Sequence, residues 1–312
     1  MKENAVHVSV LLNECIDNLN IRPEGTYLDG TLGLGGHSYE IAKRLSTGRL
    51  ICIDRDENAI AYSRERLREF ADKVTFVHAN FSEAAEILDN LGIDSVDGML
   101  FDLGVSSPQL DDADRGFSYM QDAPLDMRMN QSSSLTAYDI INGYGENEIA
   151  KILFEFGEER FSRRIAQEIV RARNQKPVET TLELVELIRS AMPAAALREK
   201  QHPAKRSFQA IRIAVNDELG EISKMMDTAP DALSSGGRLC VISFHSLEDR
   251  IIKNKIASRE NGCICPREAP ICTCGFVRTL RSVSRKPILP SDAEIENNPR
   301  SRSAKLRVAE HI

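Results

Sequence analysis

Residues 26–38 read Thr-Tyr-Leu-Asp-Gly-Thr-Leu-Gly-Leu-Gly-Gly-His-Ser, a short apolar run that ends on an acid and continues into a glycine-rich loop. The apolar run predicts a buried strand at 26–29, and the following segment, 38–45, predicts a helix. Glycines in such a loop let the backbone turn tightly and approach a ligand without Cβ collisions. The stretch therefore predicts a strand–loop–helix unit that carries a ligand-binding loop.

The same form recurs along the first 109 residues of the chain. Apolar runs that predict further buried strands lie at 49–54, 74–78 and 96–102, and helix-compatible segments lie at 57–70 and 82–91. Strands that alternate with helices at this spacing predict βαβ units and a parallel sheet covered on both faces.

Between residues 110 and 203 the strand pattern stops and helical stretches replace it. These helix patterns lie at 135–141, 146–156, 158–174 and 181–192. One amphipathic helix is expected at 207–226 and a buried strand at 238–244. We therefore expect an α/β domain built from residues 1–109 and 204–312, interrupted by a helical domain of residues 110–203 that recognises the substrate. Residues 259–312 are expected to form a basic tail that wraps the outside or is partly mobile.

Composition excludes several classes of protein. With 42% hydrophobic and 28% charged residues among 312, the chain matches soluble globular proteins. No apolar run is long enough to span a bilayer, and the N-terminus lacks the apolar core of a signal peptide, so a cytoplasmic protein without a membrane partner is expected. Residues 259–312 carry a net charge of +4 and the rest of the chain −11. This basic tail either binds a polyanion or is a solvated surface.

Acidic residues end three of the expected strands and indicate the kind of ligand. Asp54 is placed where a carboxylate can accept hydrogen bonds from both ribose hydroxyls of an adenosine. The glycine run does not fit the G-x-G-x-x-G spacing of a dinucleotide site, and Asp29 would lie close to a pyrophosphate. S-adenosyl-L-methionine carries no phosphate, and its ammonium and sulfonium groups are cationic. Asp29 and Asp102 therefore favour S-adenosylmethionine over a nicotinamide dinucleotide.

The residues after the fourth expected strand suggest methyl transfer to an amino group. Ser107-Pro108-Gln109 is similar to the (Asp/Asn/Ser)-Pro-Pro-aromatic motif of amino-methyltransferases, without its second proline and its aromatic residue. A serine hydroxyl and rigid backbone carbonyls can hold the N–H groups of an exocyclic amine in line with an activated methyl group. Ser107 and Pro108 are therefore the expected catalytic residues, although Ser-Pro also begins ordinary loops.

Motifs that match those of one known protein family extend along nearly the whole chain. They include residues 29–31, 35–37, 53–56, 102–112, 115–118, 124–129, 157–161, 202–203, 208–212, 243–250 and 298–302. On these residues the chain resembles the bacterial 16S ribosomal RNA (cytosine-N4)-methyltransferases of the MraW or RsmH type. The resemblance implies a class I, Rossmann-like methyltransferase fold with an inserted helical domain. It also implies methyl transfer from S-adenosylmethionine to N4 of a cytosine in the decoding region.

The resemblance also names site residues and a partner. The implied cofactor contacts are Gly35, Gly36, His37, Asp54, Phe81, Asp102 and Gln109. The implied partner is 16S ribosomal RNA or the small ribosomal subunit, and the oligomeric state stays open between a monomer and a homodimer. A nucleoside-binding protein without catalysis is one alternative, and a dehydrogenase that uses NAD is another.

Several cationic or aromatic side chains are candidates for contact with RNA. Arg128, Lys205, Arg206 and Arg212 precede or flank helices expected to face the cleft, where they would meet phosphates or remain solvated surface charges. His245 ends the last strand pattern, so it either contacts the target base or serves the fold.

The seven cysteines are unevenly placed, which argues against a disulfide framework. Four of them, Cys263, Cys265, Cys272 and Cys274, form a C-x-C…C-x-C pattern in the tail. Four thiolates suit tetrahedral zinc, although the usual spacing puts two residues between the cysteines of a pair. A structural zinc ion and a cluster of reduced thiols both remain open.

Overall fold

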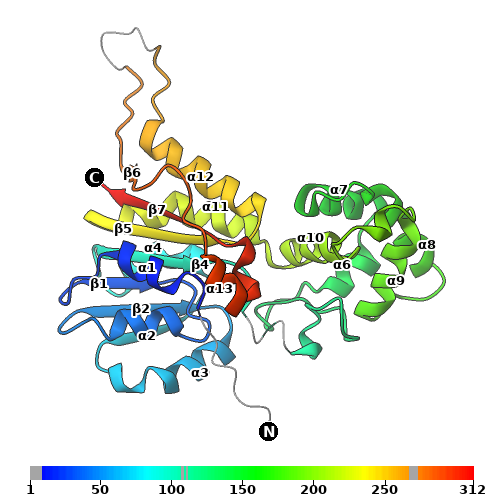
Figure 1. The fold of residues 1–312 in the computed structure, drawn as a ribbon, viewed down its shortest axis with the longest axis horizontal. Coiled ribbons are helices and arrows are strands. Elements are labelled where there is room, and N and C mark those ends of the chain that lie inside the picture. Colours follow the sequence, from blue (N-terminus) through cyan, green and yellow to red (C-terminus); the bar gives the residue numbers. More distant parts are fainter. Residues whose placement is uncertain (1–8, 107–108, 110–111, 267–272) are drawn as a thin grey trace. The chain divides into compact units, whose positions relative to one another are not determined.

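The computed structural model describes residues 9–106, 109, 112–266 and 273–312, which belong to two compact units (Figure 1). The sheet unit comprises Met1–Gly104 and Leu219–Ile312, and the helical unit comprises Val105–Glu218. None of the helices in the described part of the chain combines the length and the apolar character that crossing a bilayer requires.

The sheet unit holds seven strands in the order β3-β2-β1-β4-β5-β7-β6. The strands are β1 (Thr26–Asp29), β2 (Arg49–Asp54), β3 (Val74–His78), β4 (Val96–Asp102), β5 (Leu233–Ser243), β6 (Leu280–Ser282) and β7 (Lys305–His311). Strands β1 to β5 are parallel, and β7 runs antiparallel to both of its neighbours. The predicted bounds of the first four strands are confirmed. Because β1 lies between β2 and β4, the strand order reverses there, which is where open α/β sheets bind ligands.

Successive residues of each strand point into two different apolar cores. Leu28, Ile51 and Phe101 join one core, and Tyr27 and Leu50 join the other. The first core includes residues of α4 (Ala84–Asn90), α11 (Glu218–Thr228) and α12 (Ser246–Asn261), and the second includes residues of α1 (Leu12–Leu19), α2 (Gly36–Ala42) and α3 (Glu57–Arg66). The sheet is thus buried on both faces, as the apolar strand runs predict.

The end of the C-terminal tail adds a strand to the sheet, which was not predicted from the sequence. Strand β7 pairs with β5 and places Leu306 and Val308 in the core, and α13 (Asp292–Asn297) precedes it. The expectation that the tail wraps the outside or is partly mobile is therefore wrong for residues 305–311, because the alternation of Leu306 and Val308 with Lys305 and Arg307 is that of a half-buried strand.

The helical unit contains α6 (Ala137–Gly143), α7 (Glu146–Gly157), α8 (Ser162–Arg173), α9 (Thr181–Ala191) and α10 (Lys205–Asn216) around one core. The helix expected over 207–226 is instead two helices, because Asp217 adopts a left-handed φ of 46° between them. Helix α10 approaches α7 closely, since a Cβ on Gly157 would lie 2.6 Å from the Arg206 carbonyl oxygen. The units accordingly divide at 218/219, whereas the sequence analysis placed this boundary at 203/204.

Candidate active site

Three strand-ending acids lie at one edge of the sheet. Asp29 ends β1, Asp54 ends β2 and Asp102 ends β4. The register pairs Asp29 with Cys52 on β2 and with Leu100 on β4, each two residues before the acid that ends its strand. Since carboxyl ends of parallel strands meet at one edge, the three carboxyl groups surround the start of the glycine-rich loop.

Asp29 anchors the glycine-rich loop to the helix that follows it. Its carboxyl group accepts a hydrogen bond of 2.6 Å from the Ser38 hydroxyl on α2 and one of 3.1 Å from the Thr31 backbone N–H. Burial raises the pKa of Asp29 to about 6, against the opposite effect of these two hydrogen bonds. Asp29 is therefore already engaged by the protein, and its role is to position the loop.

The loop is also held from the side by α3. The Ser63 hydroxyl donates to the Gly33 carbonyl oxygen at 2.8 Å, and Arg66 donates to the Leu34 carbonyl oxygen at 2.9 Å. Gly35 adopts a φ of +71°, which an L side chain rarely tolerates. Ser63 and Arg66 lie about thirty residues beyond the loop, and no local pattern singles them out, so sequence reasoning missed both.

Gly36 and His37 begin α2, where space is limited. A Cβ on Gly36 would lie 2.0 Å from the Ser9 hydroxyl oxygen, so only glycine fits there without a shift. The buried His37 ring places Nε2 at 3.1 Å from the Val10 carbonyl oxygen and Nδ1 at 3.9 Å from a carboxylate oxygen of Asp102. The His37 side chain thus links the N-terminal segment to the acidic edge of the sheet.

Asp102 carries an unsatisfied acceptor. Its Oδ1 atom is buried and has no hydrogen-bond partner among the described residues, although its backbone N–H donates to the Thr31 hydroxyl at 2.6 Å. Burial raises the pKa of Asp102 to about 8, and the negative charges of Asp29 and Glu248 act in the same direction. A buried carboxylate oxygen without a hydrogen-bond partner is costly to a fold. Asp102 is therefore suited to a cation or a hydrogen-bond donor supplied by a ligand.

Backbone hydrogen bonds use only part of the accepting capacity of the Asp54 carboxylate. One carboxylate oxygen accepts from the Gly33 backbone N–H at 2.7 Å, and the other accepts from the Asp56 backbone N–H at 2.9 Å. Burial raises the pKa of Asp54, against the lowering effect of these two bonds. Each carboxylate oxygen can accept a second hydrogen bond, so Asp54 retains capacity for two hydroxyl groups.

Two further residues expected to contact the cofactor are Phe81, which is buried in the sheet unit, and Gln109, which belongs to the helical unit. Phe81 follows β3 but is buried in the core of the sheet unit, edge-to-face with Phe101 at a centroid distance of 6.2 Å. Gln109 belongs to the helical unit, where its buried side-chain oxygen accepts from the Ser106 backbone N–H at 3.0 Å. Ser107 and Pro108, the expected catalytic residues, lie outside the described residues.

His245 has a structural role at the N-terminus of α12. Its Nδ1 atom accepts from the Glu248 backbone N–H at 3.4 Å, and its Nε2 atom lies 3.1 Å from the buried Glu248 carboxylate. The same carboxylate accepts from the backbone N–H groups of residues 244 and 245. The capping box engages Nδ1, whereas Nε2 lies beside the Glu248 carboxylate without a hydrogen bond among the described residues. A contact between His245 and the target base stays a prediction.

Two of the four candidate RNA-binding cations are held by carboxylates. Arg128 pairs with Asp126 at 2.6 Å and donates to the carbonyl oxygens of residues 131 and 133. Arg212 forms two hydrogen bonds, of 2.8 and 2.9 Å, with the buried Glu218 carboxylate. Both guanidinium groups therefore stabilise the helical unit.

The other two candidates begin α10. Lys205 is exposed, and the Arg206 guanidinium group donates a hydrogen bond of 3.3 Å to the Glu158 carbonyl oxygen. A lysine in solvent and an arginine with so weak a contact can both reach a phosphate at little cost. Lys205 and Arg206 are thus the better placed of the four for RNA.

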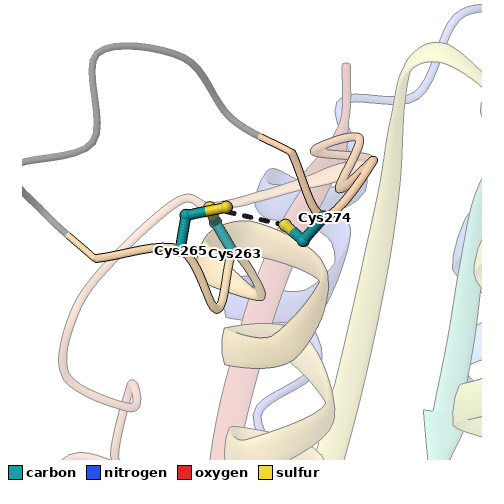
Figure 2. A group of neighbouring side chains, drawn as sticks. All are labelled: Cys263, Cys265 and Cys274. Carbon is teal, nitrogen blue, oxygen red and sulfur yellow. Dashed lines mark hydrogen bonds between the residues drawn. The ribbon is translucent and has the colours of Figure 1, made fainter.

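A cluster of thiols lies at the far end of α12 (Figure 2). The Sγ atoms of Cys263, Cys265 and Cys274 lie within 4.8 Å of one another, whereas Cys272 lies outside the described residues. Hydrogen bonds from Thr273 lower the pKa of Cys265. Because α12 has 16 residues, it separates its capping box from this cluster by about 24 Å. The thiols are therefore not part of the acidic edge.

Comparisons with known proteins identify the family. The MraW methylase family model matches residues 4–312. This chain belongs to the MraW methylase family. Proteins named ribosomal RNA small subunit methyltransferase H from Clostridioides difficile (strain 630) and Brevibacillus brevis are each 56% identical to it over 307 residues. The alignments cover 98% of this chain and 99% and 98% of those proteins.

A solved rRNA methylase from Streptococcus thermophilus aligns with 100% of the chain and 99% of its own length, at 13% identity and a TM-score of 0.39. Membership of the MraW methylase family, based on the sequence relatives, confirms the resemblance and the methyltransferase class predicted from the motifs. The Rossmann-like α/β fold is confirmed as well. The dehydrogenase alternative is inconsistent with this family.

Proposed function

We propose that this chain transfers a methyl group from S-adenosylmethionine to the exocyclic N4 of a cytosine in the decoding region of 16S ribosomal RNA. The MraW family and the names of the relatives support a small-subunit RNA substrate. The observation that carries the proposal is the buried, unpartnered carboxylate oxygen of Asp102 beside the glycine-rich loop. The N4 position and the decoding region rest on the resemblance of the motifs.

The acidic edge fits a positively charged cofactor. The pKa values of Asp29, Asp54 and Asp102 are all raised by burial, so each carboxylate would be stabilised by a nearby cation. S-adenosylmethionine offers an ammonium and a sulfonium group, whereas the pyrophosphate of a dinucleotide would be repelled. We assign the ammonium group to Asp102, because Asp29 is already held by the loop.

The remaining acid and the glycines fit the nucleoside part of the cofactor. Asp54 can accept hydrogen bonds from both ribose hydroxyls with its remaining lone pairs. The backbone of Gly35 and Gly36 can approach the ligand closely, since neither residue carries a side chain. Phe81 and Gln109 remain proposed contacts on the strength of the resemblance.

Catalysis in this proposal is mainly a matter of orientation. When bound, S-adenosylmethionine supplies a methyl group activated by its sulfonium centre. The chain then has to hold the cytosine amine in line with this group and exclude water. Ser107 and Pro108 remain the candidates that orient the amine, on sequence grounds. Lys205 and Arg206 are proposed to contact RNA phosphates, which fix the position of the substrate without reading its sequence.

The substrate also sets the expected partners. With small-subunit RNA as the substrate, we expect the reaction to occur in the cytoplasm, on free 16S RNA or on the small ribosomal subunit. A monomer and a homodimer are both compatible with this activity. Light scattering on the purified chain separates a mass of 34.8 kDa from twice that mass.

The proposal is tested with radiolabelled S-adenosylmethionine and small subunits that lack the modification. The RNA is then digested, and the labelled nucleoside is identified by mass spectrometry. Label in N4-methylated cytidine supports the proposal. Label at carbon 5 of cytosine or on adenine contradicts the assigned position. If the chain binds S-adenosylhomocysteine but transfers no label to RNA, it is the nucleoside-binding protein without catalysis.

A further inference from the structure

The described residues of the segment between α12 and β6 have no apolar core of their own. We call residues 262–279 the finger, of which 262–266 and 273–279 are described (Figure 1). Its base is fixed, since the Thr279 backbone N–H donates to the Arg259 carbonyl oxygen at 3.1 Å. None of the described finger residues is buried, and the Ile264 and Val277 side chains are 87% and 74% exposed. Apolar burial therefore does not hold the described finger together.

The thiols of the finger are arranged as zinc ligands are. In a tetrahedral site with Zn–S bonds of about 2.3 Å, neighbouring sulfur atoms are about 3.8 Å apart. The Sγ atoms of Cys263 and Cys274 are 3.6 Å apart, and those of Cys263, Cys265 and Cys274 all lie within 4.8 Å (Figure 2). One ion would thus fit all three sulfur atoms with shifts of about an ångström or less.

The local backbone suits a metal–thiolate site as well. The Thr273 backbone N–H donates to the Cys265 Sγ at 3.3 Å, and such hydrogen bonds orient a ligand and support its negative charge. Gly275 adopts a φ of +70° directly after Cys274, a conformation that glycine adopts without a steric penalty. The sequence supplies one more thiol, Cys272, two residues before Cys274.

We propose that Cys263, Cys265 and Cys274 bind a zinc ion that closes the finger. The two sides of the finger contribute separately, with two thiolates from the side that follows α12 and one from the side that leads to β6. An ion between them would replace the missing apolar core, as structural zinc does in other small segments. Zinc has no redox chemistry, and this site does not take part in methyl transfer.

Metal analysis of the full-length chain, purified under reducing conditions after growth with added zinc, tests the proposal. We expect about one zinc per chain in the wild type and almost none in the variant with Cys263→Ser, Cys265→Ser and Cys274→Ser. Ile264→Ser is the matched control, because it changes an exposed finger residue that is not a ligand. It should keep the wild-type zinc content. Circular dichroism checks that the variants fold.

Two further measurements separate the site from adventitious metal. Co²⁺ added to the zinc-free chain should produce the absorption of tetrahedral cobalt–thiolate in the wild type and in Ile264→Ser, and not in the triple variant. Removal of zinc should speed trypsin cleavage after Arg278 by roughly tenfold or more, with little change elsewhere. Less than about a third of a zinc per wild-type chain, or equal zinc in the triple variant, overturns the proposal. A disulfide between Cys263 and Cys274 in the freshly purified chain overturns it too.

Discussion

The raised pKa of Asp102 makes cofactor binding dependent on pH. At pH 7 a carboxyl group with a pKa of about 8 is about nine-tenths protonated. An ammonium group stabilises the ionised form, so the proton must leave Asp102 when the cofactor binds. We therefore expect the binding of S-adenosylhomocysteine, a stable product analogue, to release about 0.9 proton per chain at pH 7.

The release of this proton also determines how strongly the affinity for the ligand depends on pH. Between pH 6 and pH 7 the ionised fraction of Asp102 rises about tenfold, and the dissociation constant should fall by nearly the same factor. The α-amino group of the ligand, with an ordinary pKa of about 7.7–8.0, stays largely protonated in this range. Isothermal titration calorimetry in two buffers with different heats of ionisation measures both the affinity and the number of protons released.

Asp102→Asn is the control, because it keeps the shape of the side chain and removes the charge. This variant should bind more weakly, release almost no proton and show little dependence on pH. The pKa of Asp102 is about 8 in the folded state, against an ordinary value of 3.8. Asp102 therefore lowers the free energy of unfolding increasingly as the pH rises from 3.8 toward 8. The ligand-free variant should therefore unfold at a higher temperature than the wild type at pH 8, and the difference should shrink toward pH 4. Binding without proton release by the wild type, or equal release by both proteins, would refute this role.

Four further substitutions test individual parts of the account. Asp54→Ala should weaken S-adenosylhomocysteine binding by about 1.5–3 kcal/mol, measured by calorimetry, with an unchanged fold. Gly30→Ala should lower the free energy of unfolding, measured by urea denaturation, by about 1–3 kcal/mol, because its Cβ would lie 2.3 Å from the buried Phe101 ring. Arg212→Ala should cost about 3–5 kcal/mol in the same assay, because it leaves the buried Glu218 carboxylate unpaired. Lys205→Ala should leave the melting temperature unchanged and reduce the salt dependence of RNA binding by about 0.9 in slope.

Local sequence signals predicted the half of the sheet that carries the proposed cofactor site. Apolar runs ending on Asp29, Asp54 and Asp102 gave the correct strands, because a strand buried on both faces needs such a run. The break between α10 and α11 could not be predicted. The apolar spacing continues across it, and the left-handed conformation of Asp217 is not visible in the sequence.

The parts of the candidate site that could be predicted are those in which a single residue is marked by its position at the end of a strand pattern. The acids at the strand ends came directly from the pattern, whereas Ser63 and Arg66 support the loop from a distant part of the chain. The positive charge of Arg212 is evident in the sequence, but its engagement by Glu218 depends on how the chain turns after α10. Contacts between segments that are distant in the sequence therefore could not be predicted from local patterns.

A crystal structure of the chain with S-adenosylhomocysteine would show whether Asp54, Asp102 and the glycine-rich loop form the cofactor site. We expect the ribose hydroxyls on Asp54, the ammonium group on the now-partnered Oδ1 of Asp102, and the adenosine beside Gly35 and Gly36. A ligand bound elsewhere, with Oδ1 of Asp102 still without a hydrogen bond, would show that this edge of the sheet is not the cofactor site.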